Sequence, residues 1–168
     1  MRFPSSWDFD RGQVFDRPVE LRDIMPTLLD AAGAGIPESV DGSSLLDLAR
    51  GKSEGWREFV QGEHTTCYDA DYGMQYVTDG NEKYIWYHHT HEEMFFDLEQ
   101  DPLECHERSK DPECVDRVEK WRKRLANINE QRGDPRGKSG QLVPQPDGAL
   151  RLSPHYDEWK RRSQEIME

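Results

Sequence analysis

Long apolar runs are missing from this sequence of 168 residues. No stretch approaches the roughly 20 consecutive apolar residues that a membrane helix needs, so we expect a soluble chain without a membrane partner. The first residues, Met1 to Asp8, also lack the apolar centre of a secretion signal. This opening is typical of an internal stretch of a longer protein, and it leaves the cellular compartment unknown.

Positive charge is in short supply as well. The chain has 22 Lys and Arg against 34 Asp and Glu, a formal net charge of -12 at pH 7. Nucleic acids bind to clustered Lys and Arg, so this balance argues against a nucleic-acid partner. An anionic substrate would have to be met by a local basic pocket or a metal ion, because the overall field repels it.

Cysteine is scarce too, and Cys67, Cys105 and Cys114 are an odd number with no Cys-x-x-Cys pair. This pattern excludes a disulfide framework and a structural zinc site of that type. We expect free thiols, with a bond between Cys105 and Cys114 as the alternative. Glycine-rich phosphate loops and a Gly-x-Ser-x-Gly nucleophile turn are also missing.

Two helices are predicted in the first third of the chain. Asp23 is a good N-cap, Pro26 falls in the first turn where its missing N–H is not needed, and Gly33 ends the segment. These signals place a helix near residues 24–32. A shorter apolar stretch that begins after two serines predicts a second helix near residues 44–50.

Strand patterns follow in close succession. The tripeptide Asp79-Gly80-Asn81 is a hairpin signature between two apolar, aromatic-rich runs. Short connections between neighbouring strands imply antiparallel pairing. We therefore predict an antiparallel sheet of about four strands. The expected strands are residues 59–64, 74–77, 84–87 and 94–96.

One amphipathic helix is predicted over residues 112–131, after Asp111 as N-cap and with Pro112 at the first helical position. Its apolar side chains recur at spacings of three and four, so they form one stripe that we expect to pack on the sheet. The stripe consists of Cys114, Val118, Trp121, Leu125 and Ile128. Beyond it, residues 133–168 read as an extended arm with a terminal helix from Ser153 or Pro154.

Histidines supply two candidate sites. On a strand, His89, His91 and Glu93 would share one face and offer ligands to a zinc-like ion. The segment falls between two predicted strands, however, so an ordinary polar turn is the favoured interpretation and we predict no metal site. His64, at the end of a predicted strand, could do acid–base or substrate-binding work in a cleft, but its spacing alone favours a structural hydrogen-bonding role.

A family resemblance emerges from the order of these pieces. Five motifs follow one another along the chain. The first two are residues 18–33 (Pro-Val-Glu-Leu-Arg-Asp-Ile-Met-Pro-Thr and the following apolar run to Gly) and residues 41–46 (Asp-Gly-Ser-Ser-Leu-Leu). The others are Tyr-Val-Thr-Asp-Gly at 76–80, Lys-Tyr-Ile at 83–85 and Phe-Phe-Asp-Leu-Glu-Gln-Asp-Pro-Leu-Glu at 95–104. Together they resemble the C-terminal portion of sulfatases, arylsulfatase-like members of the alkaline-phosphatase-like superfamily. The resemblance covers roughly residues 18–110.

The resemblance implies an organisation for the chain. Residues 1–55 would be a remnant of the catalytic α/β domain, residues 56–132 the C-terminal subdomain with its sheet and helix, and residues 133–168 the arm. The expected fold class of the subdomain is α+β. The implied reaction is hydrolysis of a sulfate ester, with a calcium-like divalent ion and a formylglycine made from Cys or Ser in the complete enzyme.

The chain departs from the family in its chemistry. The nucleophile motif needs Cys or Ser, then Pro or Ala two residues on, then Arg four residues on. No cysteine has Arg at that distance, and Ser53 with Arg57 has Gly55 between them. The paired aspartates that would hold the ion have no counterpart either. We therefore predict no catalytic residue and no metal ligand here, and no turnover by the chain alone.

The remaining expectation concerns the substrate cleft of a complete enzyme. C-terminal subdomains of this family often line one side of that cleft. The candidate substrate-binding residues are His64, Tyr68, Tyr72 and Trp86. The implied partners are a sulfated small molecule or glycan and a missing N-terminal catalytic part. The alternative is a stand-alone, non-catalytic binding or interaction module derived from a sulfatase.

Overall fold

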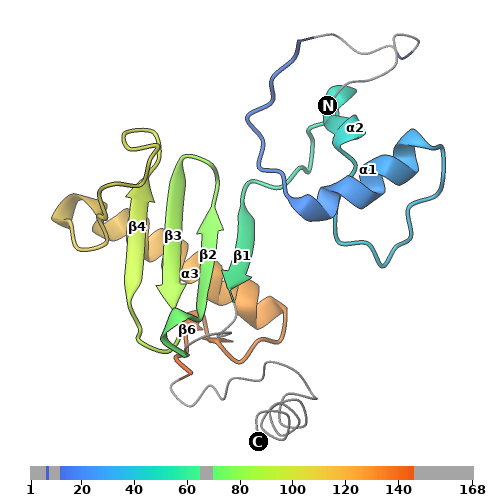
Figure 1. Cartoon of the computed structure of the whole chain (residues 1–168). Helices are drawn as coiled ribbons and strands as arrows, with labels where there is room; N and C mark the ends of the chain where they lie inside the picture. Colours follow the sequence, from blue (N-terminus) through green and yellow to red (C-terminus); the bar gives the residue numbers. More distant parts are fainter. Residues whose placement is uncertain (1–6, 8–11, 65–69, 146–168) are drawn as a thin grey trace, which may run out of the picture. The chain divides into compact units, whose positions relative to one another are not determined.

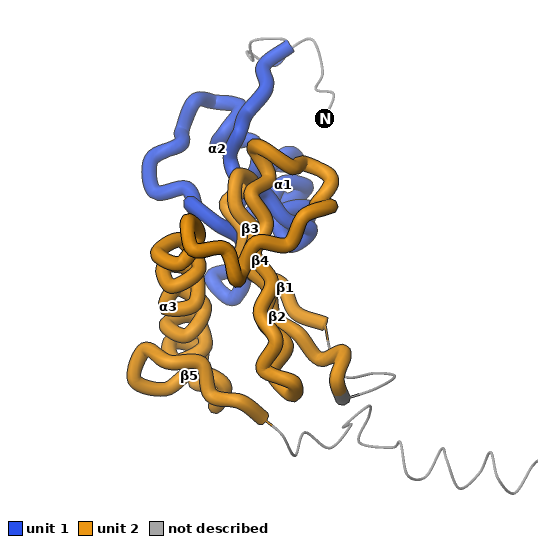
Figure 2. Tube along the Cα trace, turned by 90° about the vertical axis from the view of Figure 1, so that its left-hand side faces the viewer, with its two compact units in different colours: residues 1–60 blue, residues 61–168 orange. Residues whose placement is uncertain are grey.

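The computed structural model describes residue 7, residues 12–64 and residues 70–145. The chain divides into two compact units, residues 1–60 and 61–168, which Figure 2 distinguishes by colour. This division falls a few residues after the boundary at 55/56 expected from the sequence. The terminal helix predicted from Ser153 or Pro154 lies outside the described residues. Within those residues no helix is both long and apolar enough to span a membrane.

The first unit contains both predicted helices. A 3-10 turn, η1 (Leu21–Asp23), leads into α1 (Ile24–Ala31), and α2 (Leu45–Ala49) follows after a loop. Gly33, predicted to end this helix, lies two residues after Ala31, and its φ of 69° belongs to the left-handed region that glycine tolerates. Ser44 is the N-cap of α2, because its hydroxyl accepts a hydrogen bond of 3.2 Å from the backbone N–H of Leu46.

Asp23 has a different role from the predicted N-cap. It precedes α1 but caps no N–H of that helix with its side chain. The fully buried carboxylate instead pairs with Arg57 through both oxygens and accepts a 2.9 Å bond from the N–H of Ser43. Burial alone would raise the pKa of Asp23, but the bonds from Arg57 and two backbone N–H groups outweigh it and lower the pKa. Asp23 thus ties α1 to the two segments that follow it.

The second unit is built on four strands in a simple meander. The strands are β1 (Val60–His64), β2 (Met74–Thr78), β3 (Glu82–Tyr87) and β4 (Glu93–Asp97), and they lie in that order across the sheet (Figure 1). The β2–β3 and β3–β4 pairs are antiparallel. Gly80, with a φ of 95°, forms the predicted β2–β3 turn. The sheet confirms the α+β prediction.

The long helix packs behind this sheet (Figure 1). It begins with a 3-10 turn, η3 (Pro112–Cys114), and continues as α3 (Val115–Gln131). Trp121 and Leu125 are fully buried, as the stripe predicted, whereas Ile128 is only half-buried. Asn129 takes the buried position instead. The core of this unit comprises Val77, Tyr84, Trp86, Phe95, Val118, Trp121, Leu125 and Ala126.

The described part of the arm is more ordered than the sequence suggested. It forms a small hairpin of β5 (Gly137–Lys138) and β6 (Gln141–Leu142) beside α3. Gly137 lies so close to Ala126 and Asn129 of α3 that a Cβ atom at this position would overlap both. Cys105 is exposed, Cys114 is buried, and both are free thiols, which rejects the bond between them. Cys67 lies outside the described residues.

Candidate functional site

His64 is the last residue of β1, and its side chain is exposed. Its neighbour Glu63 accepts bonds from Gln75 at 3.5 Å and Arg136 at 3.1 Å, and so points to the face of the sheet that α3 covers. Because successive side chains of a strand point to opposite faces, His64 projects from the other face. The sequence prediction that His64 and Glu63 do not act together agrees with this geometry.

The face that carries His64 also carries Tyr76. A Cβ atom on Gly62 would overlap the ring of Tyr76, so the absent side chain makes room for the aromatic ring. Lys83 lies 5.6 Å from the centre of the same ring, a cation–π contact. Tyr72, in the 3-10 turn η2 (Ala70–Tyr72), is 61% exposed. Its ring is therefore accessible, whereas Tyr68 lies outside the described residues.

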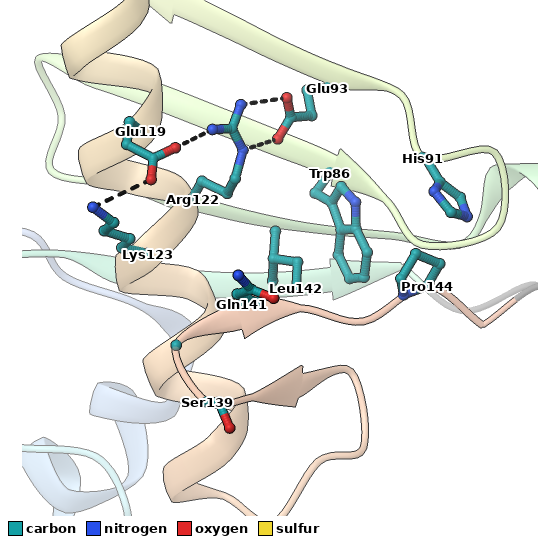
Figure 3. A pocket seen from close by; sticks show the side chains of 11 residues that line it. Trp86, His91, Glu93, Glu119, Arg122, Lys123, Ser139, Gln141, Leu142 and Pro144 are labelled. Carbon is teal, nitrogen blue, oxygen red and sulfur yellow. Dashed lines mark hydrogen bonds and ion pairs between the residues drawn. The ribbon is translucent and has the colours of Figure 1, made fainter.

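Trp86 occupies a different place from His64. It stands opposite Gln75 in the β2–β3 register and shares its helix-covered face. Only 3% of Trp86 is exposed, so it offers no open stacking surface of the kind expected from the sequence. Figure 3 shows it as one wall of a pocket beside α3. Of the proposed substrate-binding residues that the structure describes, Trp86 and His64 therefore lie on opposite faces of the sheet.

The histidine-rich segment 88–91 is a turn, as favoured from the sequence. His89 contacts Asp71 at 3.4 Å, and His91 is exposed with a φ of 66°. Glu93 belongs to β4 and is held by Arg122 at 2.6 and 2.7 Å. The row of His89, His91 and Glu93 on one strand therefore does not form. Across the described part of the chain, no three His, Cys, Asp or Glu side chains are arranged to hold a metal ion.

His88 is the buried member of the turn. It is 8% exposed, and its Nδ1 atom has no hydrogen-bond partner among the described residues. Burial, and then the nearby charge of Arg136, lower the pKa of His88. The imidazole is therefore neutral at pH 7. Its backbone carbonyl accepts a 2.8 Å bond from Gln145 of the arm.

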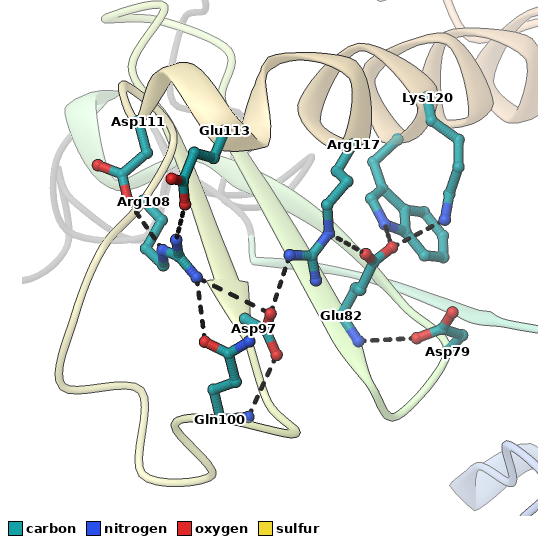
Figure 4. Close-up of polar contacts among 10 residues, drawn as sticks. Asp79, Glu82, Asp97, Gln100, Arg108, Asp111, Glu113, Arg117 and Lys120 are labelled. Atoms are coloured by element: carbon teal, nitrogen blue, oxygen red, sulfur yellow. Dashed lines mark hydrogen bonds and ion pairs between the residues drawn. The ribbon is translucent and has the colours of Figure 1, made fainter.

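Two carboxylates on the sheet join it to α3 (Figure 4). Glu82 accepts bonds from Arg117 at 2.5 Å, Lys120 at 2.8 Å and the indole N–H of Trp121 at 2.6 Å. Asp97 pairs with Arg117 at 2.9 Å. Burial alone would raise the pKa of Glu82, but the three donors from α3 outweigh it and lower the pKa.

Such perturbed carboxylates are often functional, but here every strong perturbation has a structural partner. Glu93 follows the same pattern: its pKa is lowered against the effect of burial by Arg122 and Tyr84. None of these groups is left to bind a cation. Among the residues that the structure describes, these carboxylates therefore do not fit the calcium-like ion that the family resemblance implies.

Comparisons with known proteins agree with the fold. The family described as "N-sulphoglucosamine sulphohydrolase, C-terminal" matches residues 1–131. An arylsulfatase of Clostridium perfringens is 42% identical over 115 residues, which cover 68% of this chain and 23% of the relative. The chain thus spans about a quarter of the length of this relative.

Solved structures give the same result. A putative sulfatase from Bacteroides thetaiotaomicron is 27% identical, with a TM-score of 0.61, over 74% of this chain and 27% of that chain. A 2-O GAG sulfatase is 26% identical, with a TM-score of 0.60, over 74% of this chain and 27% of its own. A phosphonate monoester hydrolase from Silicibacter pomeroyi, 21% identical with a TM-score of 0.63, shares the fold over 76% of this chain and 28% of its own. The chain belongs to the sulfatase family, and it corresponds to the C-terminal portion of these enzymes.

Proposed function

We propose that this chain is the C-terminal part of a sulfuric ester hydrolase and forms one wall of its substrate cleft. The observation that supports this most directly is the placement of His64. It is exposed at the end of β1, on the sheet face opposite α3, within the residues that match the family. Tyr72 would provide accessible aromatic surface in the turn before β2.

The chemistry divides between this chain and a catalytic part. Cleavage of a sulfate ester needs a nucleophile, a cation that stabilises developing charge, and a proton for the leaving oxygen. We assign the formylglycine and a calcium-like ion to the catalytic part. His64 would hydrogen-bond to the bound substrate, as an imidazole can donate to a sulfate or hydroxyl oxygen. The described residues supply no cation site of their own.

The substrate class follows from the relatives. One solved structure is described in complex with its substrate D-glucosamine-2-N,6-O-disulfate, and another is a 2-O GAG sulfatase. We therefore propose a sulfated small molecule or sulfated glycan as the substrate of the complete enzyme.

Residues 1–55 would pack against the catalytic part. The outward side of η1 and α1 is apolar: Leu21 is 83% exposed, Leu28 64% and Ile24 49%. Isolated apolar residues on a surface are ordinary, but several on one short helix indicate an interface. Under the proposed function, the catalytic α/β domain of the same enzyme covers this apolar surface of η1 and α1.

A chimera with the Clostridium perfringens arylsulfatase tests the proposal. Residues of this chain would replace the 115-residue segment that they match. We expect the chimera to hydrolyse an aryl sulfate. His64→Ala should lower kcat/KM on the order of 10- to 100-fold, the effect of losing a hydrogen bond to a charged group.

The matched control is His106→Ala, because His106 is a histidine with an 80% exposed side chain, far along the chain from β1. Its substitution should leave kcat/KM unchanged. A folded chimera without turnover would contradict the proposed function. A chimera in which His64→Ala and His106→Ala behave alike would reject only the role of His64.

The stand-alone module is the second candidate. The observation in its favour is the core of the second unit, where Tyr84, Phe95 and Trp121 are fully buried. A monomeric chain with one sharp unfolding transition would favour the module. Self-association through the exposed apolar side of η1 and α1 would favour the proposal that the chain is part of a larger sulfatase.

A further inference from the structure

A pocket of ≈ 520 Å³ lies beside α3, on the sheet face that carries Trp86 and Glu93 (Figure 3). Its size falls within the roughly 300–1,000 Å³ of small-molecule sites. Trp86 of β3 and Glu93 of β4 contribute one side, and Arg122 of α3 another. The third side comes from the arm, with Leu142 and Pro144.

The arm is fixed where it borders the pocket. The carboxylate of Glu130 accepts bonds of 3.2 Å from the backbone N–H groups of Ser139 and Gly140. Gln145 donates a 2.8 Å bond to the carbonyl of His88, which closes the other end of the segment. This wall lies beyond residue 131, where the family match ends. The pocket is therefore a feature that the family resemblance does not assign.

The charges of the pocket balance within it. Arg122 donates to Glu93 at 2.6 and 2.7 Å, and it also pairs with Glu119. Lys123 pairs with Glu119 at 3.2 Å. Two carboxylates thus face two cations. A sulfate group would have to displace a carboxylate from Arg122, so an anionic ligand is disfavoured.

An uncharged hydroxyl fits this arrangement better. Each carboxylate has about four acceptor positions, and guanidinium and ammonium groups carry several N–H bonds. Hydrogen bonds to such charged groups are stronger than neutral ones. A hydroxyl can donate to the carboxylates and accept from the cations without breaking either pair. Gln141, which is exposed at the pocket, can do both with its amide.

We propose that this pocket binds one uncharged sugar unit. Its hydroxyls would bond to the Glu93–Arg122–Glu119 ion pairs and to Gln141. Its C–H face would lie on the half-buried side chains of Leu142 and Pro144. The inference goes beyond the proposed function, because binding here needs neither the catalytic part nor His64.

Titration of the isotope-labelled full chain tests the proposal. The probes are cellobiose and lactose as neutral disaccharides and glucose 6-sulfate as the anionic one. We expect at least one neutral disaccharide to cause saturable NMR shifts at the Trp86 indole N–H and the Gln141 amide. Glucose 6-sulfate should bind about tenfold more weakly, because its sulfate meets balanced charges.

Two substitutions locate the binding. Gln141→Trp should fill the pocket and weaken binding about tenfold or more, and Gln141→Ala should weaken it severalfold by removing one hydrogen-bonding group. The matched control is Gln131→Trp, since Gln131 is exposed at the end of α3 and does not border the pocket. It should bind as the unchanged chain does.

Three results would overturn the proposal. The first is the absence of a saturable NMR shift with both neutral disaccharides. The second is tighter binding of glucose 6-sulfate than of the neutral disaccharides. The third is unchanged disaccharide binding in a folded Gln141→Ala variant. The chimera assay tests the sulfatase function separately, so the two proposals fail independently.

Discussion

Residues 61–64 and 70–145 enclose most of their large apolar side chains, whereas residues 14–36 leave most of theirs exposed. Trp121, Tyr84 and Phe95 have no accessible surface, but Leu28 is 64% exposed on α1 and Leu21 83% on η1. Burial of apolar surface is the main stabilising term in folding. The second unit therefore has a core of its own. In the first unit Leu46 and Leu48 of α2 are buried and Asp23 gathers polar contacts, but η1 and α1 leave apolar side chains exposed. This suits a segment that completes its packing on another domain.

The largest effect that would sharpen this comparison is expected at Trp121. Trp121→Ala removes a fully buried ring and its bond to Glu82, and should lower the free energy of unfolding by about 3–5 kcal/mol. Leu28→Ala in the first unit should change it by less than about 0.5 kcal/mol. Urea titration followed by circular dichroism measures both. Equal losses of unfolding free energy in Trp121→Ala and Leu28→Ala would contradict the difference between the two units.

Arg57→Ala tests the polar support of the first unit. It leaves the buried carboxylate of Asp23 without its ionic partner, at a cost of about 3 kcal/mol. Hydrogen exchange should become fast in α1 and stay slow in α3. Arg50→Ala is the control, because Arg50 is an exposed arginine that pairs with Asp30 in the same unit. Loss of protection in α3 as well would contradict independent units.

A smaller effect is expected at the buried amide pair of the second unit. Gln75 and Asn129 exchange two bonds, of 2.8 and 3.0 Å, between β2 and α3. Asn129→Ala removes both bonds to the buried amide of Gln75, which keeps only its 3.5 Å bond to Glu63, and should cost about 1–3 kcal/mol. Adding Gln75→Leu should recover part of this loss. A double variant whose loss equals the sum of the two single losses would show that the pair does not act as a unit.

The smallest effect concerns acidity. The pKa of His88 is lowered in the folded chain, so the unfolded chain binds a proton more readily. The free energy of unfolding should therefore fall as the pH drops below about 6.5, the ordinary value for histidine. His88→Leu should flatten the profile between about pH 6.5 and 5. His106→Leu, at an exposed site, should not.

Local patterns predicted most of the second unit. Spacings of three and four placed α3, and Asp79-Gly80 placed the β2–β3 turn, because both signals act over a few residues. The three donors to Glu82 come from a helix 35 to 39 residues away, and no local pattern encodes that distance.

The arrangement of the candidate residues could not be predicted for a similar reason. His64 and Trp86 were grouped by residue type, but the faces they occupy depend on strand register. The sequence alone predicts that Glu63 and His64, as neighbours on a strand, point to opposite faces of the sheet. Which face each one occupies depends on Gln75 and Arg136, the two residues that bond to Glu63. The hairpin of the arm depends on its contact with α3, which its composition did not indicate.

The fit of Gly62 against Tyr76 has a consequence for substitution at either position. A Cβ atom at position 62 would lie 2.4 Å from the Tyr76 ring, so a side chain there requires the ring to move. Tyr76 is only half-buried, so its ring has solvent to turn into. The two positions should therefore be coupled: Gly62→Ala should be tolerated better beside a smaller residue at position 76 than beside the tyrosine.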